Sequence, residues 1–232
     1  MHAGAPGLWS VTKFAEWKVA VGAESVSAAY EPATTAQRGV FVCAHGAGGN
    51  MKDRATLAAA NAMRAVGLGV ARFNFLYKEK GSGGPDRMPK LIECFTAVVE
   101  HVRREVKGPL IIGGRSMGGR VASMMAADGF EAAGLLLLAY PLHPPKQFDR
   151  LRDEHLPRIR LPVLCFNGTR DEFCRPDLME AALKTVKAPW TMHWLDGADH
   201  SFHVLKSSGR TDAQVLDEVR TTTNSWLGTL PT

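Results

Sequence analysis

The chain has 232 residues, of which 45% are hydrophobic and 22% are charged, and its formal net charge is +5. These values are typical of one globular α/β domain and exclude a disordered or fibrous protein, so we expect residues 1–232 to form a single domain. The basic residues are scattered along the chain, which argues against a nucleic-acid partner.

The apolar runs are all shorter than the roughly 20 residues needed to cross a bilayer, so we expect no membrane association. Residues 1–17 lack the basic and then apolar regions of a secretory signal, and a cytoplasmic location is therefore expected. The four cysteines show no CxxC spacing, and we interpret them as core thiols. Cys174 stands in a polar loop and is the one candidate for thiol reactivity.

Short apolar runs alternate with helical patterns along the chain, which is typical of βαβ units. Nearly continuous apolar strands favour a mostly parallel sheet with helices on both faces, and ligands bind beyond the C-terminal ends of such strands. The patterns predict a hairpin at 17–31, strands at 39–45, 69–75, 109–114, 134–140, 161–168 and 190–197, and helices at 53–66, 90–106, from 117 onward and at 212–226.

A single serine lies between two pairs of glycines in the stretch GGRSMGGRVASMM, residues 113–125. Gly114, Ser116 and Gly118 match the G-x-S-x-G pattern of a nucleophile elbow, and the pattern stands between a predicted strand and a predicted helix. Side chains two residues before and after the serine would collide in such a sharp turn. We therefore predict that Ser116 is a nucleophile rather than an incidental serine in a glycine-rich turn.

A serine hydroxyl needs a base that takes its proton and a third group that orients the base. His200 follows the predicted last strand, at the sheet edge where Ser116 is expected, so it is the predicted base. His203 is the alternative, three residues further on.

The predicted acid is Asp171, which follows the preceding strand and reaches the same sheet edge. Glu172 is one residue away, Asp149 follows an earlier strand, and Asp199 is adjacent to His200 in sequence. These three acidic residues are the alternatives to Asp171.

The glycine-rich stretch CAHGAGGN, residues 43–50, follows another predicted strand and exposes backbone amides at the same edge. We predict that the N–H groups of Ala47 and Met117 form an oxyanion hole. The stretch lacks the GxxxxGK[ST] pattern of a phosphate-binding loop.

Several blocks together carry a resemblance to a known family: AHGAGGNM, ARFNF, GGRSMGGRVAS, YPLHPP, and GTRDEF followed by GADHSF. The chain resembles α/β-hydrolases from about Val40 to Leu227, and more narrowly the testis-expressed protein 30-like group, which is close to the dienelactone hydrolases. The resemblance implies an α/β-hydrolase fold with an eight-stranded, mostly parallel sheet and a Ser–Asp–His triad. Dienelactone hydrolases use a cysteine nucleophile where this chain has a serine, which argues against dienelactone as the substrate.

Two arginines are candidates for substrate recognition, because a buried cation needs a partner. Arg115 precedes the predicted nucleophile and Arg72 lies within an apolar strand. We hypothesise that one of them binds a substrate carboxylate; the alternative is a structural ion pair with Asp86 or Glu93.

Only about 20 residues separate the strands predicted at 134–140 and 161–168, so no separate lid domain is expected. An open cleft suits small or flexible acyl groups. His143 and Phe202 are expected to border this cleft as substrate-binding residues.

The sequence therefore predicts a serine hydrolase that acts on carboxylic esters or thioesters through an acyl-enzyme on Ser116. Its expected partner is a small-molecule ester, and no metal or organic cofactor is required. The alternatives are a non-catalytic binding or scaffolding protein that retains the fold, and an acyltransferase. A scaffold has no physical need for a complete serine, histidine and acid set.

Overall fold

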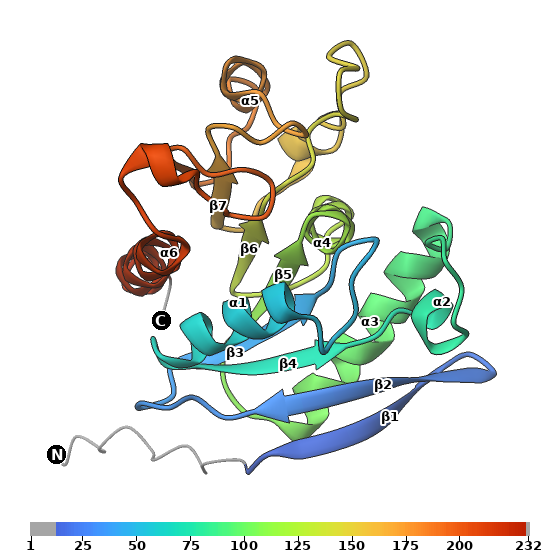
Figure 1. The fold of residues 1–232 in the computed structure, drawn as a ribbon. Helices are drawn as coiled ribbons and strands as arrows, with labels where there is room; N and C mark the ends of the chain where they lie inside the picture. The colour runs from blue at the N-terminus through green and yellow to red at the C-terminus, as the bar shows by residue number, and fades with distance from the viewer. Residues whose placement is uncertain (1–12, 231–232) are drawn as a thin grey trace, which may run out of the picture.

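An eight-stranded sheet runs through the computed structural model, which describes residues 13–230 (Figure 1). The strand order is β1-β2-β4-β3-β5-β6-β7-β8. β1 is antiparallel to β2 and β2 to β4, whereas the other neighbours are parallel. The bounds are β1 Ala15–Val21, β2 Glu24–Glu31, β3 Gly39–Ala44, β4 Leu68–Phe73, β5 Leu110–Arg115, β6 Gly134–Leu138, β7 Val163–Gly168 and β8 Trp190–Leu195.

The central strands are buried along their whole length, which explains their continuous apolar sequences. Every residue of β3, β4, β6 and β7 is buried, because helices cover both faces of the sheet there. β1 instead alternates between exposed and less exposed residues over most of its length, as expected for an edge strand with one solvated face. The prediction of a mostly parallel sheet covered on both faces is confirmed.

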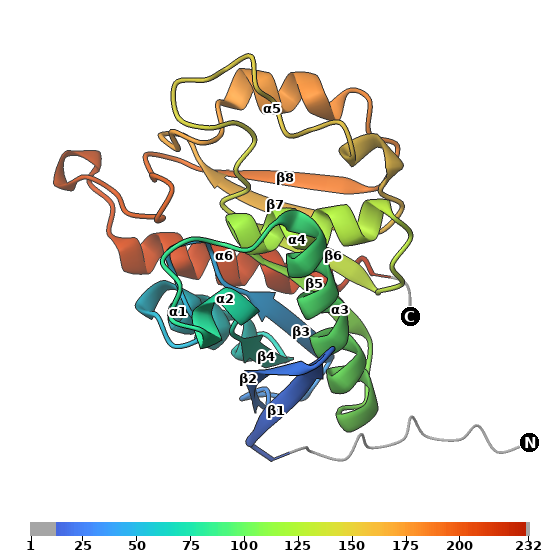
Figure 2. The same cartoon turned by 90° about the vertical axis from the view of Figure 1, so that its right-hand side faces the viewer.

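Two pairs of helices form the layers on either side of the sheet (Figures 1 and 2). α1 (Arg54–Arg64) packs beside α6 (Asp212–Leu227) on one face, and α3 (Met88–Glu105) packs beside α4 (Met117–Ala127) on the other. Each face has its own hydrophobic cluster. The α1–α6 cluster includes Phe41, Met63, Val215 and Trp226, and the α3–α4 cluster includes Phe95, Val98, Ile112 and Val121.

Local hydrogen bonds fix where two of these helices begin. The Asp53 side chain accepts a hydrogen bond from the Thr56 N–H and caps α1. Thr211 and Gln214 form a reciprocal capping box at the start of α6. No sequence pattern predicts the short helices α2 (Leu76–Glu79) and α5 (Pro176–Leu183), because four and eight residues are too few to show a helical period clearly.

The connection from β6 to β7 contains one turn of 3-10 helix, Leu156–Arg158, and otherwise consists of loop. None of the helices in the described part of the chain is long and apolar enough to span a bilayer.

All four cysteines are free and buried. The expectation that Cys174 is a reactive loop thiol is wrong, because its side chain is buried and burial raises the pKa of the thiol far above its usual range.

The close packing of Gly118 against the Ala44 carbonyl can be tested by mutation. A Cβ at Gly118 would lie 2.5 Å from the Ala44 carbonyl oxygen, which is too close for any real contact. We expect Gly118→Ala to lower the free energy of unfolding by about 1–3 kcal/mol in urea denaturation, despite the better helix propensity of alanine. Gly84→Ala is the control, because a Cβ there meets no atom within 4 Å. Equal stability of the two variants would contradict this account of the packing.

Candidate active site

Ser116 stands at the sharp turn between β5 and α4. Its backbone angles are φ 50° and ψ −117°, in a region that residues other than glycine rarely adopt. The Ser116 N–H donates to the Leu138 carbonyl over 2.8 Å, which ties the turn to the end of β6. A Cβ at Gly114 would lie 2.2 Å from the Ala44 carbonyl oxygen, and Gly118 approaches the same oxygen. The glycines therefore permit the close approach that holds the serine in this conformation.

Three side chains from three different loops form one continuous line of hydrogen bonds. His200 Nε2 lies 2.9 Å from Ser116 Oγ, and His200 Nδ1 lies 2.9 and 2.8 Å from the two carboxylate oxygens of Asp171. The Asp171 side chain is fully buried, and the His200 side chain is one-fifth exposed. Because Nδ1 faces the carboxylate and donates to it, Nε2 is free to accept the serine proton.

Asp171 is held by groups that the sequence does not reveal. Asn167 Nδ2 donates to Asp171 Oδ2 over 3.1 Å, and the Phe173 N–H donates to Asp171 Oδ1 over 2.8 Å. Asn167 is itself buried and exchanges hydrogen bonds with the main chain of Tyr140. The carboxylate that orients His200 is therefore fixed by its own loop and, through Asn167, by the loop after β6.

His200 is also held from its main chain and its ring face. Nη2 of Arg115 donates to the His200 carbonyl. The Phe173 ring lies 4.4 Å from the His200 ring, centroid to centroid. These contacts limit the positions that the imidazole can adopt between Ser116 and Asp171.

The alternative residues for the base and the acid lie elsewhere. His203 is exposed and pairs with Asp212, which raises the pKa of the histidine. Asp199 Oδ1 accepts from the N–H groups of Ser201 and His203 and so shapes the His200 loop. Glu172 and Asp149 are exposed.

The loop after β3 lies beside Ser116. A Cβ at Gly46 would lie 3.6 Å from the Ser116 Cβ. The Gly46 carbonyl accepts from the Gly49 N–H over 3.0 Å and lies 2.7 Å from His45 Nδ1. Because a trans peptide places its carbonyl and N–H on opposite sides, these bonds direct the Ala47 N–H away from the Gly49 turn.

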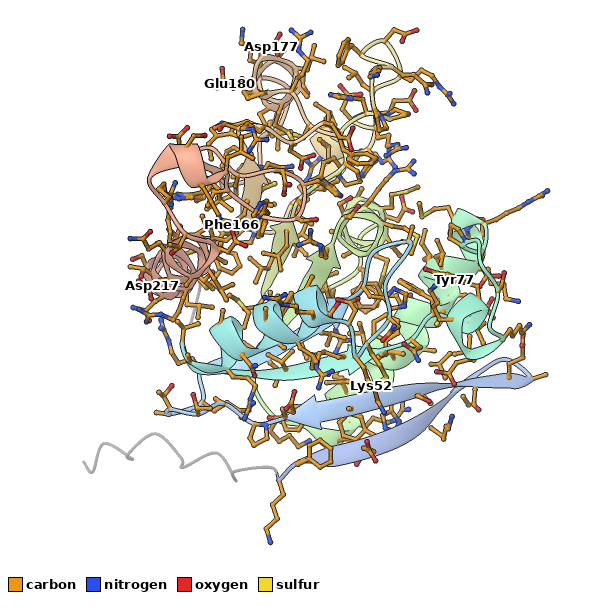
Figure 3. The ribbon with its side chains drawn as sticks, viewed as in Figure 1. Lys52, Tyr77, Phe166, Asp177, Glu180 and Asp217 are labelled. Carbon is orange, nitrogen blue, oxygen red and sulfur yellow. The ribbon has the colours of Figure 1, made fainter. Side chains whose placement is uncertain are left out.

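His45 is a neutral support for this loop. The Phe75 N–H donates to His45 Nε2 over 3.2 Å, so Nδ1 carries the ring proton and donates to Gly46. Burial lowers the pKa of His45, which keeps this tautomer uncharged. Tyr77 of α2, labelled in Figure 3, donates its hydroxyl proton to the Ala47 carbonyl over 2.8 Å.

A cavity of about 360 Å³ opens at Ser116. Its lining includes Ser116, both predicted oxyanion-hole residues and the Phe173 ring. The volume falls in the range of small-molecule sites. Sequence reasoning missed Phe173 and the other lining residues, which are Pro85, Asp86, Met88, Leu91, Arg120, Pro141 and Arg152.

Arg72 and Arg115 support loops and do not line this cavity. Arg72 forms an ion pair of 2.6 Å with Glu31 and donates to the Met51 carbonyl, so the expected partners Asp86 and Glu93 are wrong. The pairing follows from the antiparallel alignment of β2 and β4, which the sequence pattern does not specify. The Arg115 guanidinium donates to the His200 carbonyl and is partnered there, although burial lowers its pKa.

His143 and Phe202 are also placed away from the nucleophile cavity. His143 is buried, with Nδ1 2.9 Å from the Pro144 carbonyl and Nε2 accepting from the Arg175 N–H over 3.1 Å. Both ring nitrogens are thus occupied by main-chain groups. Phe202 packs against the Arg115 guanidinium and lines a separate cavity of about 480 Å³ between α1 and α6.

A second serine–histidine pair links α4 to the loop after β6. Ser123 Oγ is 2.7 Å from His155 Nε2, and both residues are buried. Ser123 also donates to the Arg120 carbonyl, and His155 forms no ion pair with a carboxylate within residues 13–230. The pair joins α4 to the loop after β6 and lacks both the strained turn and the acid found at Ser116.

In the part of the chain that the structure describes, no group of three or more histidine, cysteine, aspartate or glutamate side chains is arranged to hold a metal ion.

Comparison with known proteins agrees with the fold. Residues 37–228 match the family model described as "Alpha/beta hydrolase domain", and the chain belongs to this family. A serine hydrolase without a lid from Xanthomonas campestris has a similar structure, with a TM-score of 0.73, 22% identity, and coverage of 95% of this chain and 97% of that one. A serine hydrolase homologue from Coxiella burnetii gives a TM-score of 0.72 and 21% identity, and covers 90% and 94% of the two chains.

A dienelactone hydrolase from Anabaena variabilis is similar at a TM-score of 0.72 and 16% identity, over 95% of this chain and 99% of that chain. At these identities the likeness concerns the fold alone.

The Ser123–His155 pair makes stability depend on pH. Burial, with a contribution from Arg120, lowers the pKa of His155 from 6.5 to about 4. A histidine with a lower pKa in the folded state binds protons more readily when unfolded, so stability is intact above pH 6.5 and falls as the pH drops toward 4. We expect His155 to account for about 2 kcal/mol of lost unfolding free energy between neutral pH and about pH 4.5.

Urea denaturation at several pH values measures this loss. His155→Gln retains a polar partner for Ser123 but cannot titrate, so its stability should decline less over the same interval. An equally steep decline in the variant would show that other groups account for it.

Proposed function

We propose that this chain is a serine hydrolase that cleaves carboxylic esters or thioesters through an acyl-enzyme on Ser116. The observation that carries the proposal is the line of hydrogen bonds from Ser116 Oγ through His200 to the buried Asp171 carboxylate. The line ends at a cavity of small-molecule size. A complete set of nucleophile, base and orienting acid in this order has no structural necessity, which favours catalysis over a scaffold.

In the first step, Ser116 Oγ attacks the substrate carbonyl carbon as His200 Nε2 takes the hydroxyl proton. His200 is then an imidazolium, and the Asp171 carboxylate stabilises its charge through the bond to Nδ1. The buried position of Asp171 strengthens this interaction, because few water molecules screen it. The support from Asn167 fixes the carboxylate before the charge forms.

The negative charge that develops on the substrate oxygen needs hydrogen-bond donors. The proposed donors are the N–H groups of Ala47 and Met117, and both residues line the same cavity as Ser116. Met117 is the first residue of α4, so its N–H has no partner within the helix and lies at the positive end of the helix dipole. One such donor contributes about 3 kcal/mol to transition-state stabilisation in other enzymes.

The tetrahedral intermediate then collapses. The bond to the leaving group breaks, and the leaving alkoxide or thiolate takes the proton from His200 Nε2. Water attacks the acyl-enzyme while the same nitrogen accepts its proton, and the acid product leaves with Ser116 restored. Each half-reaction needs only the groups named here.

The loop connection between β6 and β7 leaves the cavity without a covering domain, which favours small or flexible acyl groups. The proposed substrate is therefore a small-molecule ester. Membership of the testis-expressed protein 30-like group and a cytoplasmic location remain predictions from the sequence.

Replacing the acid tests the proposed mechanism. We expect Asp171→Asn to lower kcat on short p-nitrophenyl esters by about 10⁴, as the same change does in serine proteases, because the amide favours the wrong imidazole tautomer. Glu172→Gln is a matched control, since it removes one carboxylate from the adjacent, exposed position. Unchanged turnover in a folded Asp171→Asn protein, judged by circular dichroism, would contradict the proposed role of Asp171.

A further inference from the structure

Arg120 lies one helical turn beyond the nucleophile. It belongs to α4, and its N–H donates to the Ser116 carbonyl over 3.0 Å. Residues four apart lie on the same face of a helix, so the Arg120 side chain starts from the side of α4 that carries Ser116. Arg120 accordingly lines the same cavity as Ser116.

The Arg120 guanidinium has no partner in the described part of the chain. Its Nε is buried without a hydrogen bond, and it forms no ion pair within residues 13–230. The exposed Arg158 and Arg175, in contrast, each pair with an aspartate. A partly buried cation without an acceptor is costly, so its retention at the nucleophile calls for an anion from outside the chain.

A second arginine enters the cavity from the loop after β6. Arg152 Nη1 donates to the Pro141 carbonyl over 3.2 Å, and this is its one side-chain hydrogen bond among the described residues. Its main chain is fixed on both sides. The Arg152 N–H donates to the Leu142 carbonyl, and the Tyr140 hydroxyl donates to the Arg152 carbonyl. The loop thus presents Arg152 in a defined place without neutralising it.

The positive charge of Arg120 contributes to the lowered pKa values of Arg152 and His155. Burial and then the charge of Arg120 lower the pKa of Arg152. The pKa of His155 is lowered by burial first and by Arg120 next. The charge of Arg120 therefore acts on both Arg152 and His155.

Asp86 is the one acidic residue in the described lining of the cavity. Its Oδ2 accepts from the Tyr77 N–H over 3.0 Å, at the start of α2. It forms no ion pair with Arg120 or Arg152, since none of the ion pairs within residues 13–230 joins them. Asp86 comes from the loop before α3, so the arginines that α4 and the loop after β6 bring to the cavity have no carboxylate paired with them among the described residues.

We infer that Arg120 and Arg152 form an anion-binding subsite beside Ser116, so that the preferred substrates are esters or thioesters that carry a carboxylate or phosphate group. This inference rests on the proposed function, because it places the anion of the substrate in the same cavity as the nucleophile. Arginine suits this role, because its planar guanidinium binds two oxygens of a carboxylate or phosphate at once.

The cavity also limits the size of such a substrate. A volume of about 360 Å³ with apolar walls at Met88 and Leu91 accommodates a short carbon chain between the reacting carbonyl and the anion. A long lipid chain with a distant headgroup does not fit this arrangement.

Two matched pairs of esters test the inference. In the first pair, the charge is on the acyl group: the p-nitrophenyl monoester of glutaric acid is compared with p-nitrophenyl pentanoate, which has the same number of acyl carbons. In the second pair, the charge is on the leaving group: 4-carboxyphenyl acetate is compared with 4-carbamoylphenyl acetate. Competitive inhibition by glutarate and by inorganic phosphate distinguishes a carboxylate from a phosphate site.

The expected result is a kcat/KM for the anionic member of at least one pair that exceeds the neutral member by about tenfold. Arg120→Gln and Arg152→Gln should each reduce this ratio toward one. Arg150→Gln should leave the ratio unchanged. This substitution removes an equal charge from the same loop, but Arg150 is exposed and does not line the cavity. No preference in the unmodified protein, or equal losses on both members of a pair, would overturn the subsite.

A binding measurement keeps this test independent of catalysis. Calorimetric titration of Ser116→Ala with glutarate and with phosphate should show binding of at least one anion, weakened about tenfold by adding Arg120→Gln. If the unmodified protein hydrolyses no ester but Ser116→Ala binds an anion, the proposed function fails and the subsite stands. If esters are hydrolysed without an arginine-dependent preference and no anion binds, the subsite fails and the proposed function stands.

Discussion

The site depends on one contact between two main chains. The Ala44 carbonyl oxygen at the end of β3 lies only 2.2 and 2.5 Å from where Cβ atoms of Gly114 and Gly118 would be, so the turn around Ser116 can pack against β3 only without side chains at these two positions. The same contact brings the start of α4 and the loop after β3 together. Backbone packing consequently fixes Ser116 and the start of α4, and the side chains of His45 and Tyr77 add support to the loop of Ala47.

Four arginines near the site differ in role because they differ in their hydrogen-bond and ion-pair partners. Arg72 is neutralised by Glu31, and Arg115 is directed to the His200 carbonyl, so both stabilise loops. Arg120 and Arg152 have no carboxylate partner in the described chain and line the same cavity as Ser116. A partly buried charge without a partner is unfavourable, so Arg120 and Arg152 are suited to binding an anionic ligand. Arg72 and Arg115 already have partners within the protein and hold its loops in place.

The sequence predicts the parts of this arrangement that depend on local spacing. The G-x-S-x-G pattern, the loop of Asp171 and the loop of His200 each follow a recognisable strand, and the structure brings these side chains within hydrogen-bond distance. Ion-pair and hydrogen-bond partners that depend on tertiary structure could not be predicted from the sequence. Glu31 meets Arg72 only through the pairing of β2 with β4, and Asn167 reaches Asp171 inside a buried network.

The sequence analysis also misjudged Cys174 and did not identify Arg120 or Arg152 as residues of the site. Cys174 follows polar residues in sequence, yet the loop after β7 folds inward and buries it. Arg120 could have been found, since a residue four positions after the one that begins a helix lies one turn away on the same side. Arg152 could not, because an irregular loop after β6 has no period that indicates where its side chains point.

The central claim is that His200 activates Ser116 as a nucleophile. Intact-mass analysis after exposure to a fluorophosphonate probe tests it most directly, because the probe reports activation without a chosen substrate. The account predicts one adduct on the unmodified protein that is absent in Ser116→Ala and in His200→Ala. Absence of an adduct on the folded protein, or an adduct that persists in Ser116→Ala, would contradict it.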